Sequence, residues 1–195
     1  MKSFLISCTA RSGSKYTAHV FQKLGYYVTH EKTSPEQIGS VSPKHLWSLI
    51  GNRFSPKVQQ TRNPLKVVGS LMGVRKYQPQ SYIDYMMRKI GMNIKHLRFE
   101  NDLDACAGWY VISNTVMEKY CTYRYRVEDI DRDYPELFQH LGLTIPSELP
   151  SIPTDTNTGN AHEQHRPPVN VNWEMIEAKS SYFNELKEMS KRYGY

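Results

Sequence analysis

Small polar residues and two basic residues follow the first apolar stretch of the chain. The stretch 4–8 (FLISC) precedes the segment 9–15 (TARSGSK), and 16–24 then has the pattern of a helix that ends at Gly25. A strand, a short loop and a helix N-terminus in this order present free backbone N–H groups, and the helix dipole favours an anion there. Arg11 and Lys15 add positive charge, and the two serines add hydroxyl donors. The start of the chain therefore predicts a phosphate-binding loop.

The residue order in this loop separates two classes of phosphate-binding protein. A nucleoside-triphosphatase loop has the form G-x-x-x-x-G-K-[ST], with Lys directly after the last Gly. Here Ser14 stands between Gly13 and Lys15. The segment 11–16 (RSGSKY), which includes Ser12 and Tyr16, instead resembles the 5′-phosphosulfate loop of sulfotransferases that use 3′-phosphoadenosine 5′-phosphosulfate (PAPS), of the form [KR]-[ST]-G-[ST]-x-[WY]. An ordinary tight turn between a strand and a helix is the alternative.

A second match lies in the segment 61–70 (TRNPLKVVGS). Asn63-Pro64 predicts a helix start, because Asn caps a helix and Pro fits the first helical position. Arg62 and Ser70 then have the spacing of the family's R-[ND]-P-x-x-x-x-x-S, in which both residues bind the 3′-phosphate of PAPS. The alternative is a capped helix beside an exposed arginine.

A third match lies in the segment 123–130 (YRYRVEDI). It resembles the family's Y-x-x-E-D-[LMI], a late parallel strand that runs into a helix, and Arg126 joins the expected cofactor-binding residues. The end of the chain, from Trp173 to Tyr195, resembles the final helix and aromatic tail of some bacterial members. The resemblance runs in order over nearly the whole chain, and 79–121 match only weakly. It implies a small PAPS-dependent sulfotransferase, with Tyr16 against the adenine or, alternatively, packed in the first helix.

The resemblance implies transfer of a sulfuryl group from PAPS to a hydroxyl or amine of a small-molecule or glycan acceptor. Adenosine 3′,5′-bisphosphate (PAP) is the leaving group, and no metal is required. Fixed cations stabilise the charge that develops on the bridging and sulfuryl oxygens. Arg11 and Lys15 are suited to this task, and phosphate binding without a catalytic effect is their alternative role.

Two residues are candidates for the base that takes the acceptor's proton. Glu31 follows an expected strand, and 25–31 (GYYVTHE) resembles the Gly-x-x-x-x-His-Glu of bacterial sulfotransferases. His45, in 43–46 (PKHL), resembles the Lys-Thr-His-Leu-Pro of cytosolic members, with one residue missing. His30 either orients Glu31 or caps the strand. The choice between Glu31, His45 and neither stays open.

One long segment, 144–172, has little periodicity and contains several Pro, Thr and Asn residues. A loop of this length in a compact domain is usually functional or disordered. PAPS-dependent enzymes close a basic loop over the 3′-phosphate from this part of the chain, which makes Arg166 a candidate although the familiar Arg-Lys-Gly is absent. A plain surface loop is the alternative. We expect residues 1–195 to form a single domain with a mobile loop at 144–172.

The charge of the chain is unevenly distributed. Residues 1–98 contain 16 Lys and Arg against three acidic residues, whereas 99–195 contain nine against 16. The basic half contains both expected phosphate sites, as suits a ligand with several negative charges. A nucleic-acid-binding or nucleotide-binding module without catalysis is the main alternative, but the basic residues form no cluster and no nucleic-acid motif is present, which makes nucleic acid an unlikely partner. A nucleotide or nucleoside kinase is disfavoured by the absent Gly-Lys-[ST].

Cysteine usage and hydropathy indicate the compartment. The three cysteines are too far apart for a metal knuckle and odd in number for disulfides. No apolar run of membrane-spanning length and no signal peptide occur. We therefore expect a cytoplasmic protein.

Strands alternate with helices in the pattern that predicts the fold. Strands are expected at 3–8, 26–29, 57–61 and 122–126, and helices at 15–24, 44–50, 65–76, 81–90, 104–120, 134–141 and from 173. This order predicts an α/β protein with a parallel sheet between two helical layers. The resemblance implies, more narrowly, the P-loop nucleotide-kinase-like fold. Ligands bind such sheets at the carboxyl ends of the strands, where Arg11, Arg62 and Arg126 are expected.

Overall fold

A computed structural model of the chain describes residues 3–31, 36–42, 46–73, 88, 98–153 and 168–195. The chain divides into two compact units, each made of two segments. The first unit comprises Met1–Arg62 and Val116–Thr158, and the second comprises Asn63–Thr115 and Gly159–Tyr195. That the whole chain acts as one domain stays a prediction.

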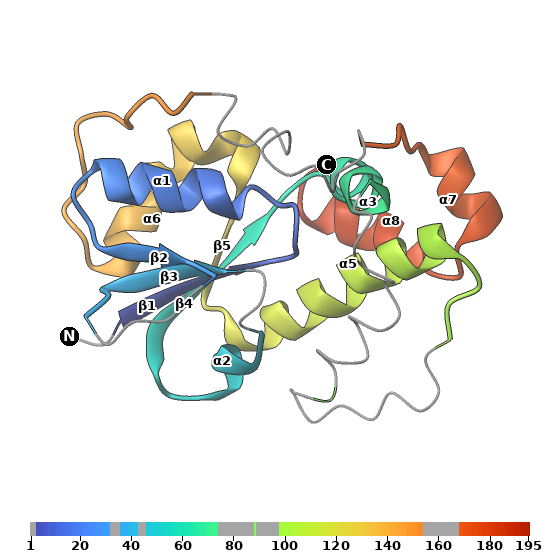
Figure 1. The fold of residues 1–195 in the computed structure, drawn as a ribbon, viewed down its shortest axis with the longest axis horizontal. Helices are drawn as coiled ribbons and strands as arrows, with labels where there is room; N and C mark the ends of the chain where they lie inside the picture. Colours follow the sequence, from blue (N-terminus) through green and yellow to red (C-terminus); the bar gives the residue numbers. More distant parts are fainter. Residues whose placement is uncertain (1–2, 32–35, 43–45, 74–87, 89–97, 154–167) are drawn as a thin grey trace. The chain divides into compact units, whose positions relative to one another are not determined.

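The first unit is built on a five-stranded sheet. Its strands are β1 (Ser3–Cys8), β2 (Val28–His30), β3 (Gly39–Ser42), β4 (Phe54–Thr61) and β5 (Tyr123–Arg126). Their order across the sheet is β2-β3-β1-β4-β5, and every neighbouring pair is parallel (Figure 1). The predicted α/β class and parallel sheet are therefore confirmed.

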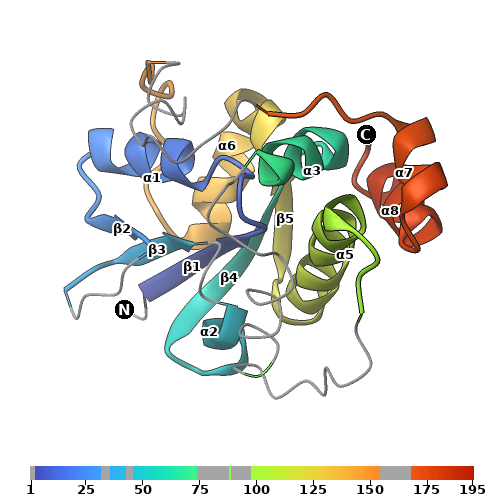
Figure 2. The same cartoon turned by 45° about the vertical axis from the view of Figure 1, so that its right-hand side comes forward.

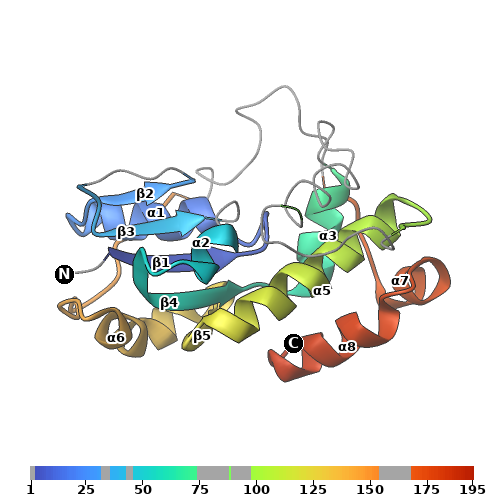
Figure 3. The same ribbon diagram turned by 90° about the horizontal axis from the view of Figure 1, so that it is seen from below.

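Helices lie on both faces of this sheet. Figure 1 shows α1 (Ser14–Lys23) and α6 (Ile130–Leu141) over one face. On the opposite face, the short helix α2 (Leu46–Ile50) contacts β1 and β4 (Figure 3). Lys57 of β4 holds this helix, because its Nζ donates to the carbonyl oxygens of Leu49 and Gly51. With helices on both faces, residues 4–8 of β1 are all buried, which suits their mostly apolar sequence.

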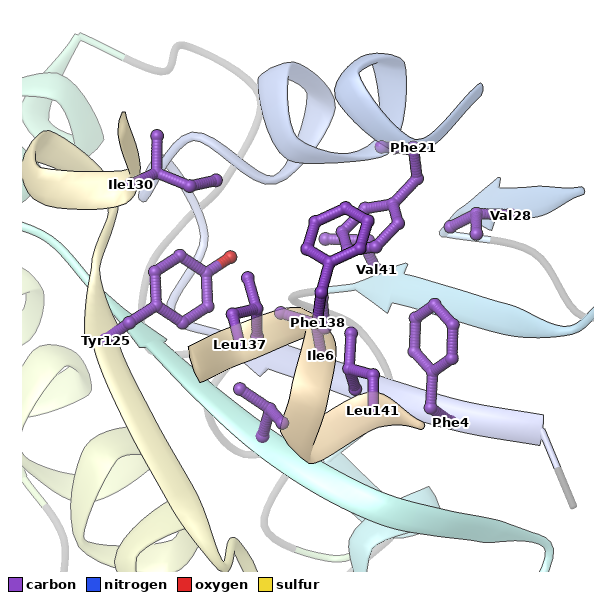
Figure 4. Close-up of a cluster of buried hydrophobic side chains, with 12 residues drawn as sticks. Phe4, Ile6, Phe21, Val28, Val41, Tyr125, Ile130, Leu137, Phe138 and Leu141 are labelled. Carbon is purple, nitrogen blue, oxygen red and sulfur yellow. The ribbon is translucent and has the colours of Figure 1, made fainter. Parts of the chain in front are cut away.

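The core between the sheet and the helices α1 and α6 combines aromatic and aliphatic side chains (Figure 4). Phe4 and Ile6 of β1 point into it, since alternate residues of a strand share one face. Phe21 of α1 stacks on Phe138 of α6 with 5.0 Å between the ring centroids. This contact joins α1 to α6 over the sheet.

The strand β3 was not expected from the sequence. Its four residues, 39–42 (GSVS), are small and mostly polar, yet all of them are buried between β1 and β2. A Cβ atom on Gly39 would lie only 2.3 Å from the ring of Phe4. The strand therefore uses small residues to make room for an aromatic core residue, and an apolar pattern does not reveal it.

The second unit is helical. It contains α3 (Pro64–Met72), the larger part of α5 (Asp102–Tyr120), α7 (Trp173–Lys179) and α8 (Phe183–Arg192), which are labelled in Figure 2. Its core joins Val67 and Val68 of α3 to Tyr110 of α5, Ile176 of α7 and Leu186 of α8. As predicted, Asn63 caps α3: its side chain accepts from the N–H groups of the helix's first turn, and Pro64 occupies the first helical position.

The expected final helix is broken into α7 and α8. The break falls at Ser180, whose backbone is extended. The buried carboxylate of Asp104 accepts hydrogen bonds there from the hydroxyls of Ser180 and Ser181 and from the N–H of Ser181. A carboxylate distant in the sequence thus stabilises the break.

Other expected elements match with shifted ends. The strand at 26–29 is observed as Val28–His30, and the helix at 134–141 begins earlier, at Ile130. Nearly all of the expected helix at 81–90 lies outside the described residues. In the long segment at 144–172, residues 144–153 and 168–172 have no helix or strand, and the middle lies outside the described residues.

Candidate active site

The expected site residues of the first unit gather at the carboxyl edge of the sheet. Arg11 follows β1, Glu31 follows β2, Arg62 follows β4, and Arg126 is the last residue of β5. Because all five strands are parallel, their carboxyl ends share one edge. The chain also runs from β1 to one side of the sheet, returns, and then crosses to the other side, so the reversal of strand order lies at β1. Parallel sheets bind ligands at such a reversal.

The loop between β1 and α1, residues 9–13, has a tight and specific backbone. The N–H of Ser12 donates to the carbonyl oxygen of Thr9 at 3.2 Å, and Arg11 and Gly13 both have positive φ angles of 72° and 86°. Gly13 is the N-cap residue of α1 and has no side chain to cap it. The first N–H groups of α1 are therefore not occupied by a capping side chain, as an anion-binding helix start requires.

The buried side-chain amide of Gln60 holds this loop in place. Gln60 of β4 donates from Nε2 to the carbonyl oxygen of Ser12, and its Oε1 accepts from Thr17 of α1 at 2.8 Å and from the hydroxyl of Tyr125 of β5 at 2.6 Å. All four residues are buried. One side chain thus joins the loop, α1, β4 and β5. Gln60 was not among the residues predicted from the sequence, because a polar side chain in a strand is usually expected at the surface.

Two arginines lie side by side at the loop. Nη1 of Arg62 donates to the carbonyl oxygen of Arg11 at 2.8 Å. Burial, followed by the positive charge of Arg62, lowers the pKa of the Arg11 guanidinium below its ordinary value. Two like charges repel each other in partly buried surroundings, and a bound anion would relieve this repulsion.

The serines and the lysine of the loop differ in their surroundings. Ser12 is 1% exposed, and within the described part of the chain its Oγ is one of the few buried side-chain atoms without a hydrogen-bond partner. Such a hydroxyl suits a ligand oxygen. Ser14 is also buried and its Oγ lies 2.9 Å from Nε2 of His30. Lys15 is exposed at the start of α1.

Tyr16 packs within the protein. It is half-buried against the aromatic core of the first unit, and burial, together with Asp131 of α6, raises the pKa of its hydroxyl. The packing role that the sequence allowed for Tyr16 is therefore observed. Its contact with an adenine stays a prediction.

Glu31 is held near the loop by the backbone. Its φ angle is 56°, a left-handed conformation that few residues other than glycine adopt, and its N–H donates to the carbonyl oxygen of Val41 at 3.2 Å. The carboxylate lies close enough to the thiol of Cys8, the last residue of β1, to contribute to its raised pKa, which is due mainly to burial. Glu31, the first base candidate, therefore lies near the point where β1 ends and the loop begins.

Arg126 is engaged by a carboxylate. Its guanidinium pairs with Asp129 of the 3-10 helix η1 (Val127–Asp129), and Asp129 also contacts Arg132 at 3.3 Å. A Cβ atom on Gly13 would meet Cγ2 of Val127 at 3.0 Å, so the first residue of η1 packs directly on the loop. Arg126 thus lies at the expected edge, with its charge partly balanced.

The remaining candidates lie in the second unit or outside the described residues. Ser70 is buried on α3 of the second unit. His45 and Arg166 lie outside the described residues. Their predicted roles, like that of Ser70, stay predictions.

The comparisons with known proteins do not name a family. No family model matches the chain, and no curated protein matches it either. Within the described residues, no three His, Cys, Asp or Glu side chains are grouped so as to hold a metal ion. None of the helices described is long and apolar enough to cross a membrane. The motifs and the geometry of the first unit are therefore the basis on which we propose a function.

Proposed function

We propose that this chain is a PAPS-dependent sulfotransferase with the nucleotide-kinase-like form of the parallel α/β fold. One observation carries the proposal. Arg62, from the motif that resembles the 3′-phosphate site, donates a hydrogen bond to Arg11, from the motif that resembles the 5′-phosphosulfate loop, although 51 residues separate them. Two motifs that bind the two phosphates of one nucleotide must lie close together.

The surroundings of the loop support a multiply charged anion as ligand. The loop combines a helix start without a capping side chain, the buried Ser12 hydroxyl and the neighbouring Arg11 and Arg62. These groups would hold the 5′-phosphosulfate, with Lys15 and Tyr16 available at the beginning of α1. Ser70 and Arg166 would add contacts to the 3′-phosphate, and Arg126 would border the nucleotide from β5.

The proposed reaction moves a sulfuryl group from PAPS to a hydroxyl or amine of a small molecule or glycan. The acceptor atom forms a bond to sulfur, the bond from sulfur to the 5′-phosphate oxygen breaks, and adenosine 3′,5′-bisphosphate leaves. Arg11 and Lys15 would stabilise the negative charge on the bridging and sulfuryl oxygens. No step in this scheme requires a metal ion.

Glu31 is the proposed base. It follows β2 on the edge that carries the loop, and its strained backbone is typical of residues at functional sites. Its carboxylate would take the proton of the attacking hydroxyl or amine. His45 remains the alternative base.

The proposal is tested by calorimetry with adenosine 3′,5′-bisphosphate and with AMP. We expect the bisphosphate to bind at least tenfold more tightly than AMP, because AMP lacks the 3′-phosphate. Arg62→Ala should remove about 1.5–3 kcal/mol of this binding, the value of a hydrogen bond to a charged group. Ser70→Ala should also reduce the preference over AMP.

Arg53→Ala is the matched control for Arg62→Ala. Arg53 precedes the other end of β4 and lies over the ring of Phe54, so its removal changes the net charge equally but far from the carboxyl edge. Equal affinity for AMP and the bisphosphate, or equal losses in Arg62→Ala and Arg53→Ala, would exclude the 3′-phosphate site. Magnesium-dependent ATP hydrolysis would indicate the kinase instead, and strongly salt-dependent binding of DNA or RNA would indicate a binding module.

A further inference from the structure

Ser14, the residue that follows the loop, forms a hydrogen bond with a histidine through its hydroxyl. Ser14 is the first residue of α1 and is 8% exposed, and its Oγ lies 2.9 Å from Nε2 of His30, the last residue of β2. Both residues lie in the first unit, at the carboxyl edge that carries the loop. A titratable ring therefore contacts one of the hydroxyls that the proposed site offers to an anion.

Among the described residues, ionisable side chains near this pair come from β1, β2 and α1. Cys8 of β1 is hydrogen-bonded with Ser14, and Glu31 follows His30 directly and lies near Cys8. On α1, Lys15 follows Ser14, and His19 lies on the next turn. The strand β3, with which β2 pairs, has no ionisable residue in Gly39–Ser42. Burial, with a smaller effect from Glu31, raises the pKa of the Cys8 thiol, so Cys8 stays neutral where histidine titrates.

The protonation of His30 decides which way the Ser14 hydroxyl can donate. A hydroxyl has one hydrogen, and a neutral imidazole has one protonated nitrogen and one that accepts. When Nε2 of the neutral ring accepts, the hydrogen of Ser14 points to His30 and is not available to a ligand. In the imidazolium both nitrogens donate, so Nε2 donates to Ser14 and the hydroxyl hydrogen is available to an anion. The imidazolium also adds a positive charge beside the loop.

We propose that His30 is a positioning residue of the anion loop that takes up a proton when the anion binds and thereby turns the hydroxyl of Ser14 toward it. This inference rests on the proposed function, since it places the sulfuryl or phosphoryl end of the ligand at residues 11–15. The group bound there is a tetrahedral oxyanion. Its affinity then increases as the pH falls through the range in which histidine titrates.

Inorganic sulfate is the suitable probe, because it stays a dianion over the whole range in which histidine titrates. We expect its affinity for the wild-type protein, measured by calorimetry at constant ionic strength, to increase about tenfold from about pH 8 to about pH 5.5, the effect of one added charged hydrogen bond. Calorimetry in buffers of different ionisation enthalpy should show net proton uptake on binding near neutral pH. This second measurement needs no variant.

His30→Gln is the informative variant. The amide nitrogen of Gln can replace Nε2 as a partner of Ser14 but does not titrate, so sulfate binding should lose most of its pH dependence and its proton uptake. His19→Gln is the matched control, because it removes another half-buried histidine of the first unit, on α1. This control should keep the wild-type pH profile and proton uptake.

Two results would overturn the inference. One is wild-type binding of sulfate without proton uptake, and the other is an equal pH dependence in the wild type and in His30→Gln. Both leave the proposed function standing if adenosine 3′,5′-bisphosphate still binds more tightly than AMP. Loss of that preference would overturn the proposed function, whatever the pH dependence of sulfate binding.

Discussion

Nη1 of Arg62 lies 2.8 Å from the carbonyl oxygen of Arg11 and donates a hydrogen bond to it. The bond joins the carboxyl end of β4 to a loop residue with a left-handed backbone, φ 72°. Arg62 therefore has two roles in the proposed site: its charge attracts the ligand, and one of its N–H groups holds the loop in place.

Arg62→Lys should separate these two roles. Lysine keeps the positive charge, but it cannot donate to Arg11 and to a phosphate in the fixed geometry of a guanidinium. We expect the affinity for adenosine 3′,5′-bisphosphate, measured by calorimetry, to fall about tenfold, and to fall further in Arg62→Ala. Wild-type affinity in Arg62→Lys would show that charge alone is used.

Gly13→Ala should reduce stability more than Gly25→Ala does. Both glycines have left-handed backbones, with φ angles of 86° and 84°, which cost an L-residue about 1–2 kcal/mol. A new Cβ at Gly13 also meets Val127 at 3.0 Å, whereas nothing lies within 4 Å of one at Gly25. Urea unfolding should show a greater loss at Gly13, and Val127→Ala should remove the excess. Equal losses at the two glycines would contradict the packing of Val127 on the loop.

Gln60→Leu should destabilise the first unit strongly. The substitution leaves the carbonyl oxygen of Ser12 and the hydroxyls of Thr17 and Tyr125 without their shared partner in a buried place. We expect the free energy of unfolding to fall by about 3 kcal/mol, because unsatisfied buried groups cost about 1–3 kcal/mol each. In a double-mutant cycle, Gln60→Leu should cost less in the Tyr125→Phe background. Additive losses would show that Gln60 and Tyr125 do not act together.

Alkaline pH should destabilise the protein partly through Cys106. Burial, with a smaller effect from Asp102, raises the pKa of this thiol to about 12. In the unfolded chain a thiol ionises at about pH 8.5, so above that pH the unfolded state binds fewer protons than the folded state. The free energy of unfolding therefore decreases as the pH rises from about 8.5 to about 12, by at most about 1.4 kcal/mol per pH unit for this group.

Urea unfolding under reducing conditions, repeated at several alkaline pH values, checks this prediction. Cys106→Ala should have a smaller alkaline slope than the wild type, whatever its stability at neutral pH. An unchanged slope would mean that Cys106 ionises as readily in the folded protein as in the unfolded chain.

The sequence predicts those parts of the structure whose signals are local. The apolar run of β1 gave its bounds correctly, and the Asn63-Pro64 pair placed the start of α3. The expected parallel sheet then placed Arg11 and Arg62 at one edge, because each follows a strand that was expected from the sequence. Residue types and short spacings were sufficient for these features.

Features that depend on distant residues could not be predicted in this way. The strand β3 is made of small residues because Phe4 occupies the space above Gly39. The break after α7 depends on the carboxylate of Asp104. The role of Gln60 depends on three partners from other elements. In each case the local pattern has no signal, since the partner lies more than 30 residues away.

The central position of β1 determines how the loop can respond to heat and to denaturant. This strand is bonded to β3 on one side and to β4 on the other, so its amide hydrogens exchange with solvent only when the sheet itself opens. The edge strand β2, which ends at His30, has β3 as its one neighbour within the sheet. Partial opening of the first unit would therefore release His30 and Glu31 before it released Arg11. The part of the anion affinity that depends on Arg11 would then outlast both the pH response of His30 and the function of the base.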